Sequence, residues 1–357
     1  MQEIRFAFVG LGNIAKTHIV ALKALPVLKQ LPFLPVFDTL ITRNPKMNQA
    51  QAQAMGFVHI STSLDESLQT QEIDIVDICT PNAMHLETVK SAVGSNKAIY
   101  CEKPLTESYA QSLRLVSLVP SGLLQQTALV FRYHPAVMRI REMVRHQQIG
   151  EVLQSQMSYR RSGYLNPCRP LSWRLDDVLS GGGAITDLGV HVLDLFRHLF
   201  GEIESVQGQT RIHVKKRPTA EDPNQWVDSK VDDWAQMHVS MRSGIQGTAE
   251  VSRIAWGAEA LEIQIYGTRG SISCDLEKDR YPNIKLLNGS SPVIPPSESL
   301  QLIPDEKSTM GVSMDCHFGA LNHFLHRYVG EDQWPNLAPS LNDCLLVEHW
   351  IDQVLQC

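Results

Sequence analysis

Residues 4–15, IRFAFVGLGNIA, join an apolar strand to a glycine-rich turn and to the start of a helix. Gly10 permits the tight turn, Gly12 lets the backbone come close to a pyrophosphate, and the final alanine is small enough for the helix to pack against the strand. The amides of Asn13 and Ile14 then lie at a helix N-terminus, where free N–H groups and a partial positive charge favour phosphate. In the first βα unit of a chain this pattern predicts a dinucleotide-binding site, and the alternative is a purely structural glycine turn.

The first part of the chain, up to about residue 131, alternates short apolar runs with helical periodicity. We expect strands at 4–9, 36–42, 73–79, 98–101 and 129–131, and helices at 15–25, 49–55, 85–93 and 113–118. A proline-bearing connection at 26–35 is longer than most loops of a βα unit. Such alternation predicts an α/β fold with a doubly wound parallel sheet, a Rossmann domain.

The pattern changes after residue 133. Polar and apolar residues alternate over 151–159, 203–214, 233–241, 247–254 and 261–266, as they do in antiparallel strands that bury one face. Helical periodicity returns at 318–328 and 344–355. We therefore expect a second, α+β domain with a mostly antiparallel open sheet.

Length and composition are those of a soluble globular protein with two domains. The chain has 357 residues, 43% hydrophobic and 20% charged. A formal net charge of -6 without a long basic run argues against nucleic-acid binding. There is no apolar run of membrane-spanning length and no signal-peptide pattern, so we expect a cytoplasmic protein without a membrane partner. Seven scattered cysteines without a CxxC pair indicate reduced thiols.

The end of the second expected strand indicates which nicotinamide cofactor is bound. An acid there holds the ribose 2′-hydroxyl of NAD, whereas an arginine accommodates the 2′-phosphate of NADP. Residues 40–44 read LITRN, with no acid at the strand tip. Thr42 can donate a hydroxyl hydrogen bond and Arg43 can pair with a phosphate, so the sequence favours NADP over NAD as the NAD(P) cofactor. The alternative is an arginine on an exposed turn.

The stretch SGGGAITDLGVHVLD, residues 180–194, places Asp187 and His191 four residues apart after a run of glycines. On an α-helix the two side chains share one face, where a carboxylate and an imidazole can reach the same substrate. The alternatives are a buried structural histidine and a zinc site. A zinc site lacks a third and a fourth ligand with recognisable spacing, and the pair His323 and His326 does not supply them. No metal is therefore predicted.

The motif CEKP, residues 101–104, lies where the expected strand 98–101 ends. This is the carboxyl edge at which open α/β sheets bind ligands. An ammonium group at Lys103 could polarise a carbonyl or share a proton with a substrate hydroxyl. The alternative is a solvated surface charge.

Together these motifs resemble the Gfo/Idh/MocA oxidoreductases, the family of glucose-fructose oxidoreductase and inositol dehydrogenase. The matching residues span nearly the whole chain: the glycine turn at 10–15, TPN with a histidine at 80–85, EKP at 102–104, WR at 173–174, GGGAITDLGVH at 181–191 and GTRG at 267–270. The resemblance implies a Rossmann domain over 1–125, a substrate-binding and oligomerisation domain over 126–336, and a C-terminal helix at 337–357 that packs back on the Rossmann domain. It also implies a homodimer or a homotetramer.

The resemblance also implies roles for individual residues. Lys103, Asp187 and His191 align with the catalytic lysine, aspartate and histidine of the family. The residues implied to line the cofactor, in addition to the glycine turn and residues 42 and 43, are Thr80, Pro81, Asn82, His85, Glu102 and Lys103.

The activity implied is reversible hydride transfer between nicotinamide and a secondary alcohol or ketone of a sugar, cyclitol or nucleotide sugar. His191 is expected to be the general base, because imidazoles titrate near neutrality. Lys103 would stabilise the developing alkoxide, and Asp187 would orient the histidine or bind a hydroxyl.

Arginine and aromatic side chains of the second domain are candidates for holding the substrate, because they suit sugar faces and attached acids or phosphates. The candidates are Arg132, Tyr164, Trp173 and Arg174, with Tyr133, His134 and Arg160 in a wider set. A different class of function is a non-catalytic sensor that binds NAD(P) and a sugar to control a partner protein.

Overall fold

The chain folds into two compact units. The computed structural model describes residues 2–29, 31–293, 311–332 and 334–356. Unit 1 is formed by the described residues of Met1–Thr106, Ala110–Val130 and Gln301–Leu345, and unit 2 by those of Glu107–Tyr109, Phe131–Leu300 and Leu346–Cys357.

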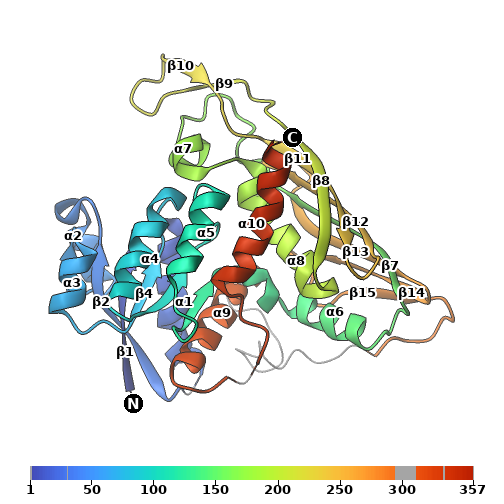
Figure 1. The fold of residues 1–357 in the computed structure, drawn as a ribbon, viewed down its shortest axis with the longest axis horizontal. Helices are drawn as coiled ribbons and strands as arrows, with labels where there is room; N and C mark the ends of the chain where they lie inside the picture. Colours follow the sequence, from blue (N-terminus) through green and yellow to red (C-terminus); the bar gives the residue numbers. More distant parts are fainter. Residues whose placement is uncertain (1, 30, 294–310, 333, 357) are drawn as a thin grey trace. The chain divides into compact units, whose positions relative to one another are not determined.

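Unit 1 is built on a six-stranded sheet in the order β3-β2-β1-β4-β5-β6, and every strand pair is parallel. The strands are β1 (Gln2–Val9), β2 (Phe33–Ile41), β3 (His59–Ser61), β4 (Ile75–Ile78), β5 (Ala98–Cys101) and β6 (Gln125–Thr127). The helices are α1 (Asn13–Leu28), α2 (Pro45–Ala54), α3 (Leu64–Thr70), α4 (His85–Gly94), α5 (Tyr109–Leu118) and α9 (Val312–Tyr328) (Figure 1). The predicted Rossmann domain is confirmed.

The expected connection at 26–35 between the first helix and the second strand is wrong. Helix α1 continues through Pro26 to Leu28, so the connection to β2 covers only residues 29–32. A proline in the last turn removes a single helical N–H, and the Lys29 amide still donates to the Leu25 carbonyl at 2.9 Å.

The last strand of the sheet is also displaced from its expected position. Residues 129–131 contribute to the 3-10 helix η2 (Val130–Tyr133), and the edge strand is β6 instead. Strand β6 contains two glutamines and no apolar run, so the sequence pattern did not predict it. Both are hydrogen-bonded: Gln126 donates to the Ala320 carbonyl at 3.2 Å, and the Gln125 side chain accepts from the Leu341 amide at 2.7 Å.

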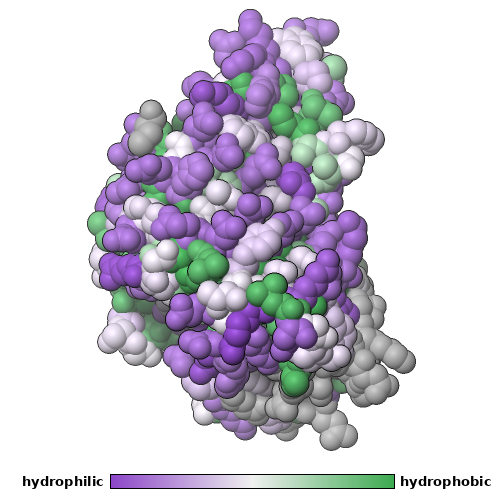
Figure 2. Space-filling model, turned by 90° about the vertical axis from the view of Figure 1, so that its right-hand side faces the viewer, coloured by the Kyte–Doolittle hydropathy of each residue, from purple (hydrophilic) through white to green (hydrophobic). Residues whose placement is uncertain are grey.

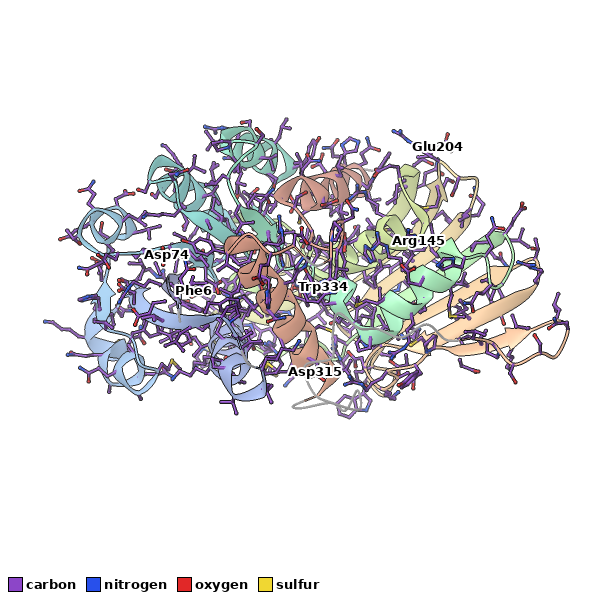
Figure 3. All side chains as sticks on the ribbon, turned by 90° about the horizontal axis from the view of Figure 1, so that it is seen from below. Phe6, Asp74, Arg145, Glu204, Asp315 and Trp334 are labelled. Atoms are coloured by element: carbon purple, nitrogen blue, oxygen red, sulfur yellow. The ribbon has the colours of Figure 1, made fainter. Side chains whose placement is uncertain are left out.

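Helix α9 comes late in the chain but packs against α1. The hydroxyl of Tyr328, at its C-terminal end, donates to Asp74 Oδ1 at 2.9 Å, just before β4. Figure 3 labels Asp74, Asp315 on α9, and Trp334, whose ring lies 5.2 Å from that of His323. Unit 1 is thus completed by a segment far from it in the sequence.

Unit 2 is built on a seven-stranded sheet in the order β15-β14-β13-β7-β12-β11-β8, in which only β12 and β7 pair in parallel. The strands are β7 (Val152–Arg160), β8 (Ile203–Arg211), β11 (Trp234–Met241), β12 (Gln246–Ser252), β13 (Ala260–Gly267), β14 (Gly270–Asp275) and β15 (Asn283–Leu286). The predicted α+β domain with a mostly antiparallel sheet is confirmed.

The structure adds strands that the pattern did not predict: β14, β15 and the separate hairpin of β9 (Lys216–Pro218) and β10 (Trp226–Asp228). Strand β8 also ends earlier than expected, at Arg211, because the amides of His213 and Val214 donate to Asp233 Oδ2 at 2.8 Å each. A side-chain carboxylate thus replaces the neighbouring strand as acceptor.

Helices lie on one face of this sheet. They are α6 (Pro135–Arg145), α8 (Val190–Phe200) and the part of α10 (Leu341–Gln356) that follows Leu345 (Figure 1). The short helix α7 (Asp177–Ser180) packs instead against the 3-10 helix η3 (Trp173–Leu175). Gly247 of β12 allows α8 to approach, because a Cβ there would come within 2.4 Å of the Phe196 ring. Close packing of this kind makes α8 a rigid carrier for its side chains.

The other face of the sheet is polar. A depression on it is lined mainly by polar residues of the central strands, including Gln156, Arg160, Gln236, Glu250 and Glu262. Figure 2 looks onto the side that lies at the right in Figure 1, where most of the surface is hydrophilic and the hydrophobic patches are small and separate. Among the described residues, no helix combines the length and the apolar character needed to cross a bilayer.

Candidate active site

The glycine turn after β1 has the geometry that a pyrophosphate requires. Gly10 has a φ of +97°, and a Cβ at this position would lie 2.9 Å from the Cys79 carbonyl oxygen. Gly12 is the N-cap of α1, and a Cβ there would meet nothing within 4 Å. The first glycine is therefore needed for the turn, and the second leaves open space beside the backbone.

The N-terminus of α1 is available to an anion. No side chain caps its first amides, and its first turn contains no acidic residue. Asn13 is exposed and Ile14 is partly exposed. Free amides at the positive end of a 16-residue helix form a site for phosphate, so the residues present fit the predicted dinucleotide.

The tip of β2 carries the two residues expected to select the cofactor. Thr42 Oγ1 accepts hydrogen bonds from Asn48 Nδ2 at 2.8 Å and from the Asn44 amide at 3.4 Å. Both bonds use the oxygen as acceptor, so the hydroxyl can still donate one bond. Arg43 is exposed. The turn is thus braced by Thr42 while the arginine extends from it.

The loop after β4 contains a buried polar atom that suits a ligand. Thr80 Oγ1 is buried and has no hydrogen-bond partner among the residues that the structure describes. Pro81 precedes the 3-10 helix η1 (Asn82–Met84), and Asn82 is buried. An unsatisfied buried hydroxyl is costly unless a ligand or water pairs with it, which fits the prediction that this loop lines the cofactor.

His85 is placed differently from its neighbours. It is fully buried, with Nε2 2.9 Å from the Thr80 carbonyl and Nδ1 3.1 Å from the Leu105 carbonyl. Burial lowers the pKa of His85, so the ring is neutral and donates to one of the two carbonyls at a time. Its contacts make it a brace between the Thr80 loop and the segment after Lys103, and it presents no ring nitrogen to solvent.

Lys103 is the second residue after the end of β5 and is partly exposed. Its backbone amide donates to Glu102 Oε2 at 3.2 Å, and its peptide bond to Pro104 is cis. The side chain therefore starts from a backbone that is tied to the preceding carboxylate at the carboxyl edge of the sheet.

Behind this strand end lies a buried charge network that the sequence analysis missed. His18 on α1 is fully buried, with Nδ1 3.0 Å from Asp77 Oδ2 and Nε2 3.3 Å from Glu102 Oε1. Burial alone would lower the pKa of His18, but the contacts with the Asp77 carboxylate and with Cys79 together raise this pKa well above its ordinary value. Burial would likewise raise the pKa of Glu102, and His18 beside it lowers it instead. The buried network of Asp77, His18 and Glu102 therefore reaches the residue that directly precedes Lys103.

A signal for this network was present in the sequence. His18 lies in the buried stripe of α1 with Ala15, Ile19 and Leu22, and Asp77 interrupts the otherwise apolar strand IVDI. A charged residue in the middle of a buried strand requires a partner, and a histidine in an apolar helix stripe is a natural one.

The segment that carries Asp187 and His191 is not one regular α-helix. Residues Ile185–Gly189 form the π-helix η4, and α8 starts at Val190. A π-helix bonds residues five apart instead of four, so Asp187 and His191 do not have the α-helical relation that their spacing predicted. The regular α-helix expected over both residues is therefore wrong, although both remain on one continuous helical segment.

A buried aspartate holds the start of the π-helix. The Gly183 and Ile185 amides donate to the two Asp232 carboxylate oxygens at 2.8 and 2.9 Å, and the Ala184 amide donates to the Asp232 carbonyl at 2.9 Å. A Cβ at Gly183 would come within 1.8 Å of that carbonyl oxygen. The glycine is thus required for the approach to Asp232.

The two predicted catalytic residues of unit 2 have different surroundings. Asp187 Oδ2 lies 3.1 Å from an Arg253 guanidinium nitrogen, and the aspartate side chain keeps 27% exposure. His191 is 7% exposed and packs edge-on against Phe131, with ring centroids 4.9 Å apart, and against Tyr159 at 6.2 Å. The aromatic rings restrict the imidazole to a narrow set of orientations.

Arg132 and the wider set of substrate candidates have structural partners. Arg132 is buried, and its Nε donates to Asp194 at 2.9 Å. His134 caps α6, where Nδ1 accepts from the Ala136 amide at 3.0 Å and Nε2 donates to the Leu276 carbonyl at 2.8 Å, and burial lowers the pKa of His134 to about 4. Tyr133 is buried, and Arg160 pairs with Glu262 across the polar face of the sheet. None of these contacts involves Asp187 or His191.

Tyr164, Trp173 and Arg174 form one cluster. The Arg174 guanidinium lies 4.2 Å from the Trp173 ring centroid, and both residues start the 3-10 helix η3 (Trp173–Leu175). Arg253, which was not predicted, connects them: its guanidinium lies 4.8 Å from the Tyr164 ring centroid and donates to the Arg174 carbonyl at 3.3 Å.

The histidine pair considered for zinc has carboxylate partners. His323 Nε2 lies 3.0 Å from Asp332, and His326 Nδ1 lies 3.0 Å from Glu331. Within the described part of the chain, the group with metal-compatible spacing is His18, Asp77 and Cys79. Its members already bond one another, because Cys79 Sγ donates to Asp77 Oδ1 at 3.2 Å.

Comparison with known proteins agrees with this architecture. A family model described as an oxidoreductase family with an NAD-binding Rossmann fold matches residues 4–125, and a model of the GFO/IDH/MocA C-terminal domain matches residues 137–273. Levoglucosan dehydrogenase from Pseudarthrobacter phenanthrenivorans is 29% identical over 294 residues, 78% of this chain and 75% of that protein. The scyllo-inositol 2-dehydrogenase (NAD(+)) of Bacillus subtilis is 27% identical over 294 residues, 81% of this chain and 79% of that protein.

Solved structures extend the likeness to the whole chain. Levoglucosan dehydrogenase in complex with NADH and levoglucosan superposes with a TM-score of 0.86 at 26% identity, covering 99% of this chain and 96% of that chain. An NAD binding oxidoreductase from Klebsiella pneumoniae reaches a TM-score of 0.88 at 22% identity, with the same coverage, which is a likeness of fold. The expected fold is confirmed over both parts of the chain.

Proposed function

Because the chain belongs to the GFO/IDH/MocA family of oxidoreductases, with an NAD-binding Rossmann fold, we propose that it is a dehydrogenase of sugars or cyclitols. It would transfer a hydride between a nicotinamide cofactor and a secondary alcohol or ketone, and a nucleotide sugar belongs to the same substrate class. The observation that carries the proposal is the uncapped N-terminus of α1 beside the open space at Gly12, which fits a dinucleotide. Relatives named as levoglucosan and inositol dehydrogenases support the substrate class.

The proposed catalytic residues are Lys103, Asp187 and His191. His191 takes the proton of the substrate hydroxyl as general base, and Lys103 stabilises the negative charge that develops on the oxygen. Asp187 orients the histidine or binds a neighbouring hydroxyl. The nicotinamide, when bound, accepts or donates the hydride. Tyr164, Trp173 and Arg174 are the proposed substrate contacts, since Arg132 is occupied by Asp194.

The proposed cofactor contacts divide by chemistry. Backbone amides of the glycine turn and of Asn13 and Ile14 hold the pyrophosphate. The Thr80 hydroxyl, which is buried without a partner among the described residues, would pair with the bound cofactor. The other proposed contacts are Pro81, Asn82, Glu102 and Lys103, while His85 braces their loop from behind.

We further propose that NADP(H) is preferred over NAD(H), because the tip of β2 carries Arg43 and no acid. Replacing Arg43 with alanine is expected to weaken NADPH binding about 10- to 100-fold, the usual loss for a hydrogen bond to a charged group. NADH binding should change less than about twofold. Titration of protein fluorescence with each cofactor gives both dissociation constants.

Lys46, an exposed cation three residues further on, is the matched control. Lys46→Ala should leave both affinities unchanged if Arg43 contacts the 2′-phosphate directly. Equal losses for NADPH and NADH in Arg43→Ala would contradict the preference for NADP(H).

The activity is tested by cofactor titration followed by a substrate screen. The protein is first titrated with NAD(H) and NADP(H), and then mixed with a panel that includes levoglucosan, L-sorbose, inositols and nucleotide sugars while nicotinamide absorbance is recorded. Turnover of at least one of these polyols is expected. Cofactor binding without turnover across the panel would favour a non-catalytic sensor instead.

We also propose a homodimer or a homotetramer, because the family resemblance implies one and the seven-stranded sheet has an open, polar face. Light scattering coupled to size-exclusion chromatography is expected to give twice or four times the 40.0 kDa chain mass. A monomeric mass at working concentration would contradict this.

A further inference from the structure

One arginine that the catalytic proposal does not use connects three of its residues. Arg253 follows β12 and is 2% exposed. One of its terminal nitrogens lies 3.1 Å from Asp187 Oδ2, and the other donates to the Arg174 carbonyl at 3.3 Å. The face of the guanidinium lies 4.8 Å from the Tyr164 ring centroid. A single planar cation therefore contacts the aspartate and two of the proposed substrate-binding residues.

The backbone of Arg253 is fixed as firmly as its side chain. Its amide donates to the Asp233 carbonyl at 2.9 Å, and its carbonyl accepts from the Tyr164 amide at 3.1 Å. The guanidinium thus starts from a position held on both sides. A guanidinium has its donors in a rigid fork. The fixed backbone of Arg253 therefore also fixes the position in which its guanidinium holds Asp187 Oδ2.

Asp232, the residue before Asp233, holds the start of the helical segment that carries Asp187. Asp232 accepts the amides of Gly183 and Ile185 through its carboxylate. The start of the π-helix is therefore anchored through its backbone, and Asp187 two residues later is anchored through its side chain. Two buried charged groups, Asp232 and Arg253, hold one short segment at two points.

The burial of Arg253 indicates that this arrangement serves more than stability. A buried guanidinium carries a large desolvation cost, and a hydrophobic side chain of similar size would often be equally stable. Asp187, in contrast, keeps 27% exposure, so it can be held by Arg253 and still meet a ligand from the solvent side.

We propose that Arg253 is a positioning residue, which fixes the Asp187 carboxylate relative to the Tyr164 ring and the Arg174 backbone. The inference rests on the proposed function, which assigns Asp187 its catalytic role. It goes beyond that function in assigning the orientation of the aspartate and of the substrate-binding cluster to one buried cation.

The test is a double-mutant cycle between Arg253 and Asp187, with Arg253→Gln, Asp187→Asn, the double variant and the conservative Arg253→Lys. Arg253→Gln is expected to lower kcat/KM about 100-fold, since a misplacement of about 1 Å costs that much. Arg253→Lys should recover about tenfold of the loss, because it keeps the charge but not the fork. In the Asp187→Asn background, Arg253→Gln should cause a clearly smaller loss than in the wild type, because only the contacts with Tyr164 and Arg174 remain to be lost. NADH affinity should stay within about twofold throughout, and additive losses would overturn the proposal.

The same variants are compared by urea unfolding, which needs no substrate. The midpoint of the double variant should be no lower than that of Arg253→Gln, because the two side chains stabilise each other. Additive midpoint shifts would overturn the coupling whether or not the protein is active. A wild-type protein that is inactive toward every substrate would contradict the proposed function, and the unfolding cycle would still decide the coupling.

Arg139 supplies the matched control. It is 1% exposed, donates to the Arg280 carbonyl at 3.0 Å and lies 4.1 Å from the Tyr281 ring centroid. Arg139→Gln should lower stability to a similar extent and leave kcat/KM of the folded protein within about twofold. A kinetic loss equal to that of Arg253→Gln would show that any buried arginine of unit 2 has this effect, and would overturn the specific role.

Discussion

Replacing His191 with alanine is expected to lower kcat by about 10²- to 10⁴-fold, the usual contribution of a positioned general base. The affinity for the nicotinamide cofactor should change less than about twofold, because the proposed cofactor contacts belong to unit 1 and His191 belongs to unit 2. The two quantities are measured by steady-state turnover with the best polyol of the panel and by fluorescence titration with NADH.

His191→Asn separates proton transfer from packing. Asparagine keeps a polar group between Phe131 and Tyr159 but cannot take a proton near neutral pH. A loss similar to that of His191→Ala is therefore expected. His198, the other histidine of α8, is the control, and His198→Ala should keep kcat within about twofold. Unchanged turnover in His191→Ala would contradict its role as the base.

Replacing His18 with glutamine is expected to lower the free energy of unfolding by about 3–5 kcal/mol, the usual cost of removing one partner from a buried ion pair. The variant leaves the Asp77 and Glu102 carboxylates buried without the cation between them. Urea unfolding of wild type and variant gives the difference. Since Glu102 precedes Lys103, turnover is also expected to fall.

The cost of this substitution should depend on pH in a defined direction. The folded-state pKa of His18 is raised above its ordinary 6.5, so its stabilisation is complete below pH 6.5 and is lost as the pH rises through the folded-state value. The pKa of Glu102 is lowered from 4.5, so its stabilisation is complete above pH 4.5 and is lost as the pH falls through its folded-state value. The difference between wild type and variant should be largest between pH 4.5 and 6.5.

His317, whose ring lies 5.4 Å from that of His18, is the control for this pH dependence. Burial, reinforced by the neighbouring His18, lowers the pKa of His317 to about 3, so it is neutral throughout that window. His317→Gln should lower the free energy of unfolding by an amount that does not vary with pH there. A cost of His18→Gln that is equally independent of pH would contradict the charged state of His18.

Local sequence patterns were sufficient to predict structure where a residue type has one dominant structural role. The glycine turn was predicted because Gly10 needs a positive φ and Gly12 needs open space, and both requirements belong to the backbone around them. The parallel sheet was predicted because strands buried on both faces must be apolar. The same rule failed at β6, where the buried Gln126 and the partly buried Gln125 bond to Ala320 and Leu341, more than 190 residues away.

Side-chain roles were predictable only in part. The sequence identifies Arg132, His134 and Arg160 as polar residues near the expected site, but it does not show that Asp194, Leu276 and Glu262 already pair with them. It also does not show Arg253, because an arginine after a strand is ordinarily a surface residue. The contact that holds the start of the π-helix was equally hidden, since its acceptor Asp232 lies 47 residues from Ile185.

The sequence by itself determined the fold class, the dinucleotide-binding type of the Rossmann domain and the family, because each depends on periodicity or on short motifs with local geometric requirements. Only the tertiary structure decided which polar residues are braces and which can meet a ligand. The role of a buried charged residue depends on the partner that compensates its charge. For His18, Arg253 and the segment of Asp187, that partner comes from a distant part of the chain.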